Sequence, residues 1–267
     1  MVVDVEAPDS AAALRDRAGR VRRSDYDVLV ASGGDGTLHE VVNGLVRSSK
    51  DARPKLAVCP MGRGNDFAAE IGIADESDTF DAVVSGESRL LDLGRSGNGV
   101  FLSIAGTGFD ARAARRAQET PFLSGSALYT YAVLRTLLDF RPLEARVRHD
   151  GGTYEGLITF AAVGNARRYG GGMRIAPEAD LEDGLLDLCL VRDISRLTLL
   201  RMFPTVFSGS HLAHPSVLYR KTRFVEIETT EPAEVFADGE YLQRTPLRLD
   251  VLPRELEVLA RASALLG

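Results

Sequence analysis

Two glycine-rich segments of this chain place acidic side chains where they could meet a bound phosphate. The first is Gly33-Gly34-Asp35-Gly36-Thr37, which follows an apolar run at residues 28–31. The apolar residues after it recur at helical spacing: Leu38, Val41, Val42 and Leu45. This pattern predicts a strand, a tight turn and a helix, with Thr37 as the helix N-cap. Such a turn directs backbone N–H groups at an anion, and the helix N-terminus adds positive charge.

Asp35 decides what kind of anion site this first glycine turn (residues 33–37) could be. A carboxylate repels phosphate unless a metal ion lies between the two groups. Mg²⁺, bound directly or through its waters, is the usual bridge. A glycine-rich turn alone fits a simple tight connection equally well, but the Asp among three glycines favours magnesium–nucleotide chemistry.

A second glycine turn (residues 62–66) repeats this design after another apolar run. Gly62 and Gly64 allow close backbone approach, and Arg63 could reach a phosphate. Asn65 and Asp66, taken alone, fit ordinary helix caps. Because adjacent parallel strands bring their carboxyl ends to one edge of a sheet, we expect both turns to surround a single nucleotide.

The elements that must position these turns divide the chain into two parts. Up to about residue 93, strand patterns at residues 26–31 and 55–59 alternate with helical patterns, which predicts an α/β domain with a parallel sheet. From about residue 94 to 254, short β-branched or alternating runs predict a mainly antiparallel, β-rich domain. These runs lie at residues 100–104, 154–163, 185–191, 224–229, 233–237, 247–252 and 256–259.

Composition and charge set limits on the function. The 267 residues are 45% hydrophobic and 26% charged, with a formal net charge of −6, which argues against an extended nucleic-acid surface. The N-terminus lacks a basic, apolar leader, so we expect a cytoplasmic protein. Two apolar stretches, residues 122–140 and 197–207, contain charges and predict helices that pack on a core rather than span a membrane. Core packing is favoured over membrane docking for each.

Several motifs, taken together with the two turns, resemble the diacylglycerol kinase and sphingosine kinase superfamily, in the form of bacterial soluble lipid kinases. The resemblance runs from about Tyr26 to the C-terminus. It is carried by Gly106-Thr107-Gly108-Phe109-Asp110-Ala111, Val163-Gly164-Asn165, Gly170-Gly171-Gly172, residues 176–187 and Ala237-Asp238-Gly239-Glu240. It implies an ATP-binding α/β domain and a β-rich, sandwich-like lipid domain of the kind found in NAD kinases and diacylglycerol kinases. Residues 255–267 would return to the first domain.

The resemblance also assigns roles to residues in the nucleotide site. Gly33, Gly34, Gly36 and Thr37 would border the phosphates of ATP, as would Gly62, Arg63 and Asn65. Asp35, Asp66 and Asp92 would join a water-mediated network to Mg²⁺. Arg63 replaces the threonine that is usual in this family. The strand and Asn-Pro glycine loop that usually open the family precede the position where this chain begins, so the match is N-terminally short.

Two further assignments concern a metal loop and a catalytic base. Asp180 and Asp183, with the carbonyl of Leu185, match a structural Mg²⁺ loop of the family, although an ordinary acidic turn is the alternative. Glu240 is the candidate general base, since a lipid hydroxyl needs a carboxylate to accept its proton. His39, in the helix after the first turn, is expected to lie near nucleotide or to be an ordinary surface residue.

The expected function is therefore an ATP-dependent lipid kinase that acts at a membrane surface on diacylglycerol or a related glycerolipid. An NAD kinase is the enzymatic alternative, and a catalytically silent nucleotide- or lipid-binding module is the other. The sequence does not distinguish among lipid acceptors, because acyl chains are recognised by pocket shape. It also leaves a homodimer open.

Overall fold

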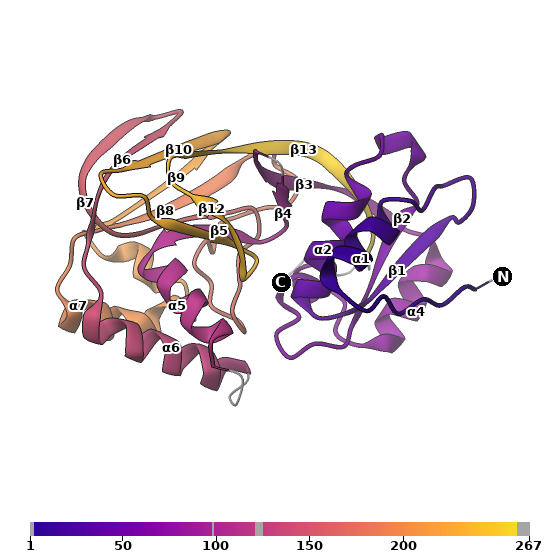
Figure 1. The fold of residues 1–267 in the computed structure, drawn as a ribbon, viewed down its shortest axis with the longest axis horizontal. Helices are drawn as coiled ribbons and strands as arrows, with labels where there is room; N and C mark the ends of the chain where they lie inside the picture. Colours follow the sequence, from indigo (N-terminus) through magenta and orange to yellow (C-terminus); the bar gives the residue numbers. More distant parts are fainter. Residues whose placement is uncertain (1–2, 98, 121–124, 261–267) are drawn as a thin grey trace.

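The computed structural model describes residues 3–97, 99–120 and 125–260, which form two domains (Figure 1). The helices are α1 (Ala11–Ala18), α2 (Asp35–Leu45), α3 (Asp66–Glu70), α4 (Glu76–Ser85), α5 (Phe109–Gln118), α6 (Gly125–Asp139) and α7 (Arg196–Met202), with 3₁₀ turns η1 (Lys50–Ala52), η2 (Phe203–Val206) and η3 (Ser210–Ala213). The strands are β1 (Val28–Gly33), β2 (Lys55–Pro60), β3 (Ser88–Ser96), β4 (Gly99–Phe101), β5 (Ile104–Gly108), β6 (Leu143–His149), β7 (Gly152–Gly164), β8 (Leu186–Arg192), β9 (Val217–Thr222), β10 (Phe224–Thr229), β11 (Glu234–Ala237), β12 (Glu240–Arg244) and β13 (Leu247–Leu259).

The first domain has the predicted strand–turn–helix units. β1 and β2 pair in parallel, and Gly33 lies opposite Pro60 at their carboxyl ends. The two glycine turns therefore leave the sheet at the same edge, as expected. Helix α2 buries the apolar face read from the sequence, formed by Leu38, Val41, Val42 and Leu45.

Helix α2 begins at Asp35, so the prediction that Thr37 is its N-cap was wrong. The N-cap is Gly34, which has extended backbone angles and no side chain to cap the helix. The Thr37 side chain packs against Gly33 of the turn instead. A Cβ built on Gly33 would lie only 2.4 Å from Thr37 Oγ1. The helix can thus start earlier, which directs its first free N–H groups toward the space between the two turns.

The second domain is the predicted β-rich unit. Within the described residues its strands follow the order β13-β10-β6-β7-β5-β11-β12, with β9 joined through β8 to β7. Every pair in this series is antiparallel. Helices α5, α6 and α7 cover one side of the sheet (Figure 1), and a buried apolar cluster that includes Phe109, Val133 and Leu199 lies between.

Strand β13 joins the two domains. It pairs with β10 in the second domain, with β3 along most of its length, and in parallel with β2 through Val258 and Leu56. The sequence pattern predicted two strands here, at residues 247–252 and 256–259. The structure has one strand with a register shift between Leu252 and Leu256, where Pro253 lacks a ladder N–H and Arg254 has a positive φ of 52°. Residues 261–267 lie outside the described part.

Candidate active site

The two glycine turns meet backbone to backbone at the edge of the parallel strands. A Cβ built on Gly62 would lie 2.4 Å from the Cα of Gly34, and one built on Gly34 would lie 3.1 Å from the Cα of Gly62. Only glycine leaves room for this approach. Asn65, which has a positive φ of 53°, closes the second turn by accepting from the Gly62 N–H and donating to the Gly62 carbonyl, both at 2.9 Å. Arg63 is exposed in the same turn.

Asp35 lies between the first turns of α2 and α3. Its carboxylate receives two long contacts, at 3.4 Å each, from the backbone nitrogens of Asp66 and Phe67. A Cβ on Gly64 would lie 2.9 Å from Asp35 Oδ2. Burial raises the pKa of Asp35, and the nearby negative charge of Asp66 adds to the shift. A weakly bonded, crowded carboxylate of this kind is a ready partner for a cation.

Asp66 joins the second glycine turn to the β-rich domain. Its two carboxylate oxygens accept hydrogen bonds from the N–H groups of Gly171, at 2.7 Å, and Gly172, at 2.8 Å. Both glycines have positive φ angles, 84° and 101°, which lets two successive N–H groups point at one carboxylate. Asp66 therefore holds the Gly170-Gly171-Gly172 segment next to the two glycine turns.

Glu240 comes from the β-rich domain and reaches the first glycine turn. It begins β12 after a tight turn in which Asp238 and Gly239 have positive φ angles of 52° and 86°. A Cβ on Gly36 would lie 3.6 Å from Glu240 Oε1, so this carboxylate lies over the start of α2. Desolvation raises the pKa of Glu240, whereas His39 and Arg15 act against the shift. A raised pKa moves a carboxylate toward the range that suits a general base.

Asp92, expected beside Asp35 and Asp66, makes its contacts elsewhere. It is fully buried in β3, and its carboxylate accepts from the N–H groups of Gly184 and Arg254, both at 2.6 Å. Burial raises its pKa, and the charges of Asp183 and Asp180 contribute. These contacts tie the acidic loop (residues 180–185) to the bulge of β13 and not to the glycine turns.

The carboxylates of the acidic loop already have partners in the protein. One oxygen of Asp183 lies 2.6 Å from the Lys221 ammonium, and the other accepts from the Leu185 N–H at 3.0 Å. Asp180 accepts from the Glu182 N–H at 3.0 Å. No cluster of three or more acidic, histidine or cysteine side chains that could hold a metal occurs in the described residues, at this loop or at the glycine turns. The assignment of Asp180, Asp183 and Leu185 to a structural Mg²⁺ stays a prediction.

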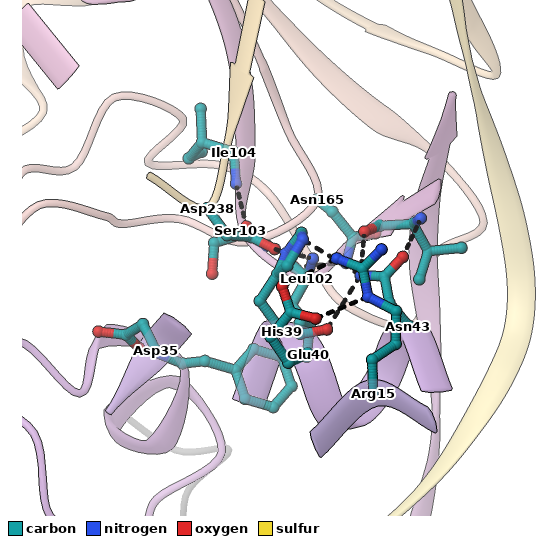
Figure 2. A network of polar contacts seen from close by, with 12 residues as sticks. Arg15, Asp35, His39, Glu40, Asn43, Leu102, Ser103, Ile104, Asn165 and Asp238 are labelled. Atoms are coloured by element: carbon teal, nitrogen blue, oxygen red, sulfur yellow. Dashed lines mark hydrogen bonds and ion pairs between the residues drawn. The ribbon is translucent and has the colours of Figure 1, made fainter. Parts of the chain in front are cut away.

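A polar network that the motifs did not predict lies beside this site (Figure 2). Asp238 accepts from the N–H groups of Leu102, Ser103 and Ile104, at 2.9, 2.8 and 3.3 Å. It also pairs with His39. The only sequence signal was the Asp-Gly-Glu motif itself, because the partners of Asp238 lie more than a hundred residues away along the chain.

The fold and the site together define a two-domain phosphotransferase, in which an α/β domain carries the two glycine turns and a β-rich domain brings Glu240 to the first of them. The profile of the diacylglycerol kinase catalytic domain matches residues 1–96, and that of the YegS C-terminal NAD kinase beta sandwich-like domain matches residues 103–260. The chain belongs to the diacylglycerol kinase family and is a lipid kinase of that type. Both the predicted family and the predicted fold class are confirmed.

Relatives and solved structures agree with this assignment. A diacylglycerol kinase of Mycobacterium tuberculosis is 36% identical over 242 residues, which cover 87% of this chain and 76% of the relative. One from Staphylococcus aureus is 31% identical over 248 residues, covering 91% and 77%. A putative diacylglycerol kinase from Bacillus anthracis str. Sterne superposes with a TM-score of 0.79 at 22% identity, over 97% of this chain and 86% of that one, and shows the fold.

Proposed function

We propose that this lipid kinase transfers the γ-phosphate of ATP to the hydroxyl of diacylglycerol or a related glycerolipid. The observation that carries the proposal is the position of Glu240, whose Oε1 lies 3.6 Å from where a Cβ on Gly36 would be. The nucleotide phosphates would lie at the first glycine turn, against the N-terminus of α2. The base and the phosphate site therefore face each other across the junction of the two domains.

In the proposed reaction, Glu240 accepts the hydroxyl proton as the lipid oxygen attacks the γ-phosphorus. The bond from the γ-phosphorus to the bridging oxygen breaks, ADP leaves, and the proton later passes from Glu240 to water. Asp35 is the residue that would hold Mg²⁺, and its raised pKa fits a cation nearby. Asp66, whose two oxygens accept from Gly171 and Gly172, would hold the neighbouring turn in place. Bound magnesium would neutralise charge on the transferring phosphoryl group. The glycine N–H groups orient the phosphates for attack.

The decisive experiment is transfer of labelled γ-phosphate from ATP to a panel of lipids in mixed micelles, with NAD as a competing acceptor. Glu240→Gln keeps the shape of the side chain and removes its basicity, so turnover should fall by about 10²-fold or more. Glu228→Gln, an exposed glutamate of β10, is the matched control and should keep full activity. Near-wild-type turnover in Glu240→Gln would refute the assigned base. Phosphorylation of NAD alone would refute the lipid acceptor.

The lipid partner requires a surface that meets the membrane, and we propose the outer face of α6 and α7. Each helix buries one side and exposes another, so the expectation of core packing holds for only part of each. The exposed apolar side chains of the described residues include Tyr131, Leu134 and Leu138 on α6, Leu197 and Leu200 on α7, and Phe207 just after η2. Arg196, at the start of α7, links the two helices. Its guanidinium donates to the carbonyls of Leu138 in α6, at 2.7 Å, and of Phe140 just after α6, at 3.3 Å.

Vesicle binding tests this surface. Leu138→Asp combined with Leu200→Asp should reduce sedimentation with vesicles that contain anionic phospholipid, because charged side chains do not enter the acyl region. Val84→Asp, at an exposed apolar position on α4, is the control and should bind like the wild type. Unchanged binding of the double variant would reject this face. No described helix is long and apolar enough to cross a bilayer.

A further inference from the structure

Helix α2 carries a buried histidine directly after the first glycine turn. His39 is only 6% exposed, and its Nδ1 lies 3.0 Å from Oδ2 of Asp238. These two residues are 199 positions apart in the sequence. Asp238 belongs to the same tight turn as Glu240. The bond therefore joins the helix that starts at the phosphate site to the turn that carries the proposed base (Figure 2).

The Asp238 carboxylate is held firmly on its other side. It accepts from three successive backbone N–H groups between β4 and β5, those of Leu102, Ser103 and Ile104. Its own N–H donates to the Ile104 carbonyl at 2.9 Å, and its side chain is 4% exposed. A buried carboxylate with this many donors has little freedom to move. Any partner of Asp238 is thus fixed relative to the β-rich domain.

Asp238 determines which imidazole nitrogen of His39 carries the proton. Asn43, one helical turn after His39, lies beside the other nitrogen, with its Nδ2 3.2 Å from Nε2. Its Oδ1 accepts from the Val100 N–H at 3.0 Å, which fixes the orientation of the amide. The two Nδ2 hydrogens have closer acceptors in the carbonyls of His39 and Val100, at 2.9 Å each, so this contact does not assign the tautomer. The Asp238 carboxylate is an acceptor, and Nδ1 therefore carries the hydrogen that His39 donates to it.

From this geometry we infer that His39, through its Nδ1–H bond to Asp238, positions Glu240 over the first glycine turn. The inference rests on the proposed function of Glu240 as the base. His39 is a positioning residue, because it acts on the reaction only through the Asp238 turn. Gln118 supports the same turn from α5 by donating to the Gly239 carbonyl at 2.7 Å. An imidazole that carries a hydrogen on Nδ1 is the form that bonds to Asp238.

The charged groups around His39 affect how it titrates. Burial of the imidazole opposes its protonation, but the bond to Asp238 and the charges of Glu40 and Glu240 outweigh burial and raise the pKa of His39. Glu40 is itself paired with Arg15 of α1, at 2.6 and 2.8 Å. A doubly protonated His39 keeps the Nδ1–H that bonds to Asp238. Acid should therefore leave the positioning bond in place.

Two substitutions of His39 separate positioning from other roles. His39→Ala removes the donor, so we expect kcat to fall by about 10- to 100-fold with the KM for ATP unchanged. His39→Asn places an amide nitrogen close to the position of Nδ1 and does not titrate. It should recover most of kcat. Unchanged kcat in His39→Ala, a raised KM for ATP as the main effect, or equal losses in both variants would each overturn the inference.

A double substitution tests whether His39 acts through Glu240. In a Glu240→Gln background, His39→Ala should cost little further activity, because the group that it positions has already lost its basicity. Additive losses would overturn the inference. Nitrogen NMR of the imidazoles reports the Nδ1–H tautomer independently of turnover, with His39→Asn identifying the signal. An Nε2–H tautomer would overturn the inference directly. The Nδ1–H tautomer in a wild-type protein that phosphorylates no lipid would refute the proposed function and, with it, the role of His39.

Discussion

The two glycine turns and the acidic loop both place aspartates on tight, glycine-containing backbone, yet they are arranged in opposite ways. At the turns, Asp35 has only two long contacts, at 3.4 Å, and a second carboxylate nearby. At the loop, Asp92 accepts two bonds of 2.6 Å, and Asp183 pairs with Lys221. The comparison teaches that a carboxylate without close hydrogen-bond donors or cations, and not the presence of an acidic residue alone, marks the ligand site. The predictions below test this contrast.

The largest expected effect is the loss of activity in Asp35→Asn. The substitution removes the charge that would hold magnesium, so lipid phosphorylation should fall by about 10²-fold or more. The thermal midpoint should stay equal or rise, because removing the charge relieves repulsion with Asp66 and the cost of burial. Kinase assays and thermal unfolding of one preparation measure both. A large loss of stability would show that Asp35 is structural.

For Asp92→Asn we expect the reverse result, which is a loss of stability with activity kept. An amide cannot accept two charge-assisted bonds, and its NH₂ would face one of the N–H groups of Gly184 and Arg254. The free energy of unfolding should fall by about 2 kcal/mol. The turnover of the folded fraction should stay near that of the wild type. Urea titration gives the stability, and activity per folded molecule gives the comparison. If activity disappears while stability is kept, Asp92 belongs to the magnesium network after all.

The third prediction concerns how stability depends on pH through Asp187, which lies in strand β8 beside the acidic loop. Burial raises the pKa of Asp187 to about 6, against the opposing effects of Tyr219 and Lys221. The native state therefore holds a proton that the unfolded chain releases, and stability falls as pH rises from about 4 to about 6. Asp187→Asn should remove the share of this slope that Asp187 contributes and add roughly 1 to 2 kcal/mol at neutral pH. Urea titrations across this range would contradict the prediction if the wild type and the variant have parallel profiles.

The smallest effect is expected from Lys221, which neutralises the acidic loop. Lys221→Ala leaves Asp183 and Asp180 without that cation, so Mg²⁺ should stabilise the variant, by about 1 kcal/mol or less. The wild type should respond little. Thermal unfolding with and without Mg²⁺ measures this difference. Lys50→Ala, on a lysine paired with Glu255 of β13, is the control. An equal response in all three proteins would mean that Lys221 does not exclude the metal.

The parts of the molecule that depend on local patterns were predictable from the sequence. Strand β10 was predicted with its observed bounds, and both glycine turns lie at one sheet edge as expected. Helix α5 was not predicted, because it packs through small residues, Ala111, Ala113 and Ala114, and lacks a stripe of large apolar ones. Its helical period is formed by alanines against arginines, so a search for large apolar residues at helical spacing misses it.

The candidate site was only half predictable. Its motifs indicated which residues could bind phosphate and accept a proton. The bonds that bring them together join distant segments: Asp66 to Gly171 and Gly172, and His39 to Asp238. No short window of sequence contains both partners of such a pair. His39 was read as a nucleotide neighbour or a surface residue, whereas it is buried at the boundary between the domains.

Strand β13 has a consequence for the order in which the chain can fold. The first domain holds the N-terminal residues, but the edge of β2 is covered only when β13, near the other end of the chain, pairs beside it. During synthesis, β2 must therefore wait until β13 has emerged before its sheet is closed. Until then it presents an open strand edge, which is a hazard for aggregation. The domain of the two glycine turns thus starts to form before the β-rich domain and is completed after it.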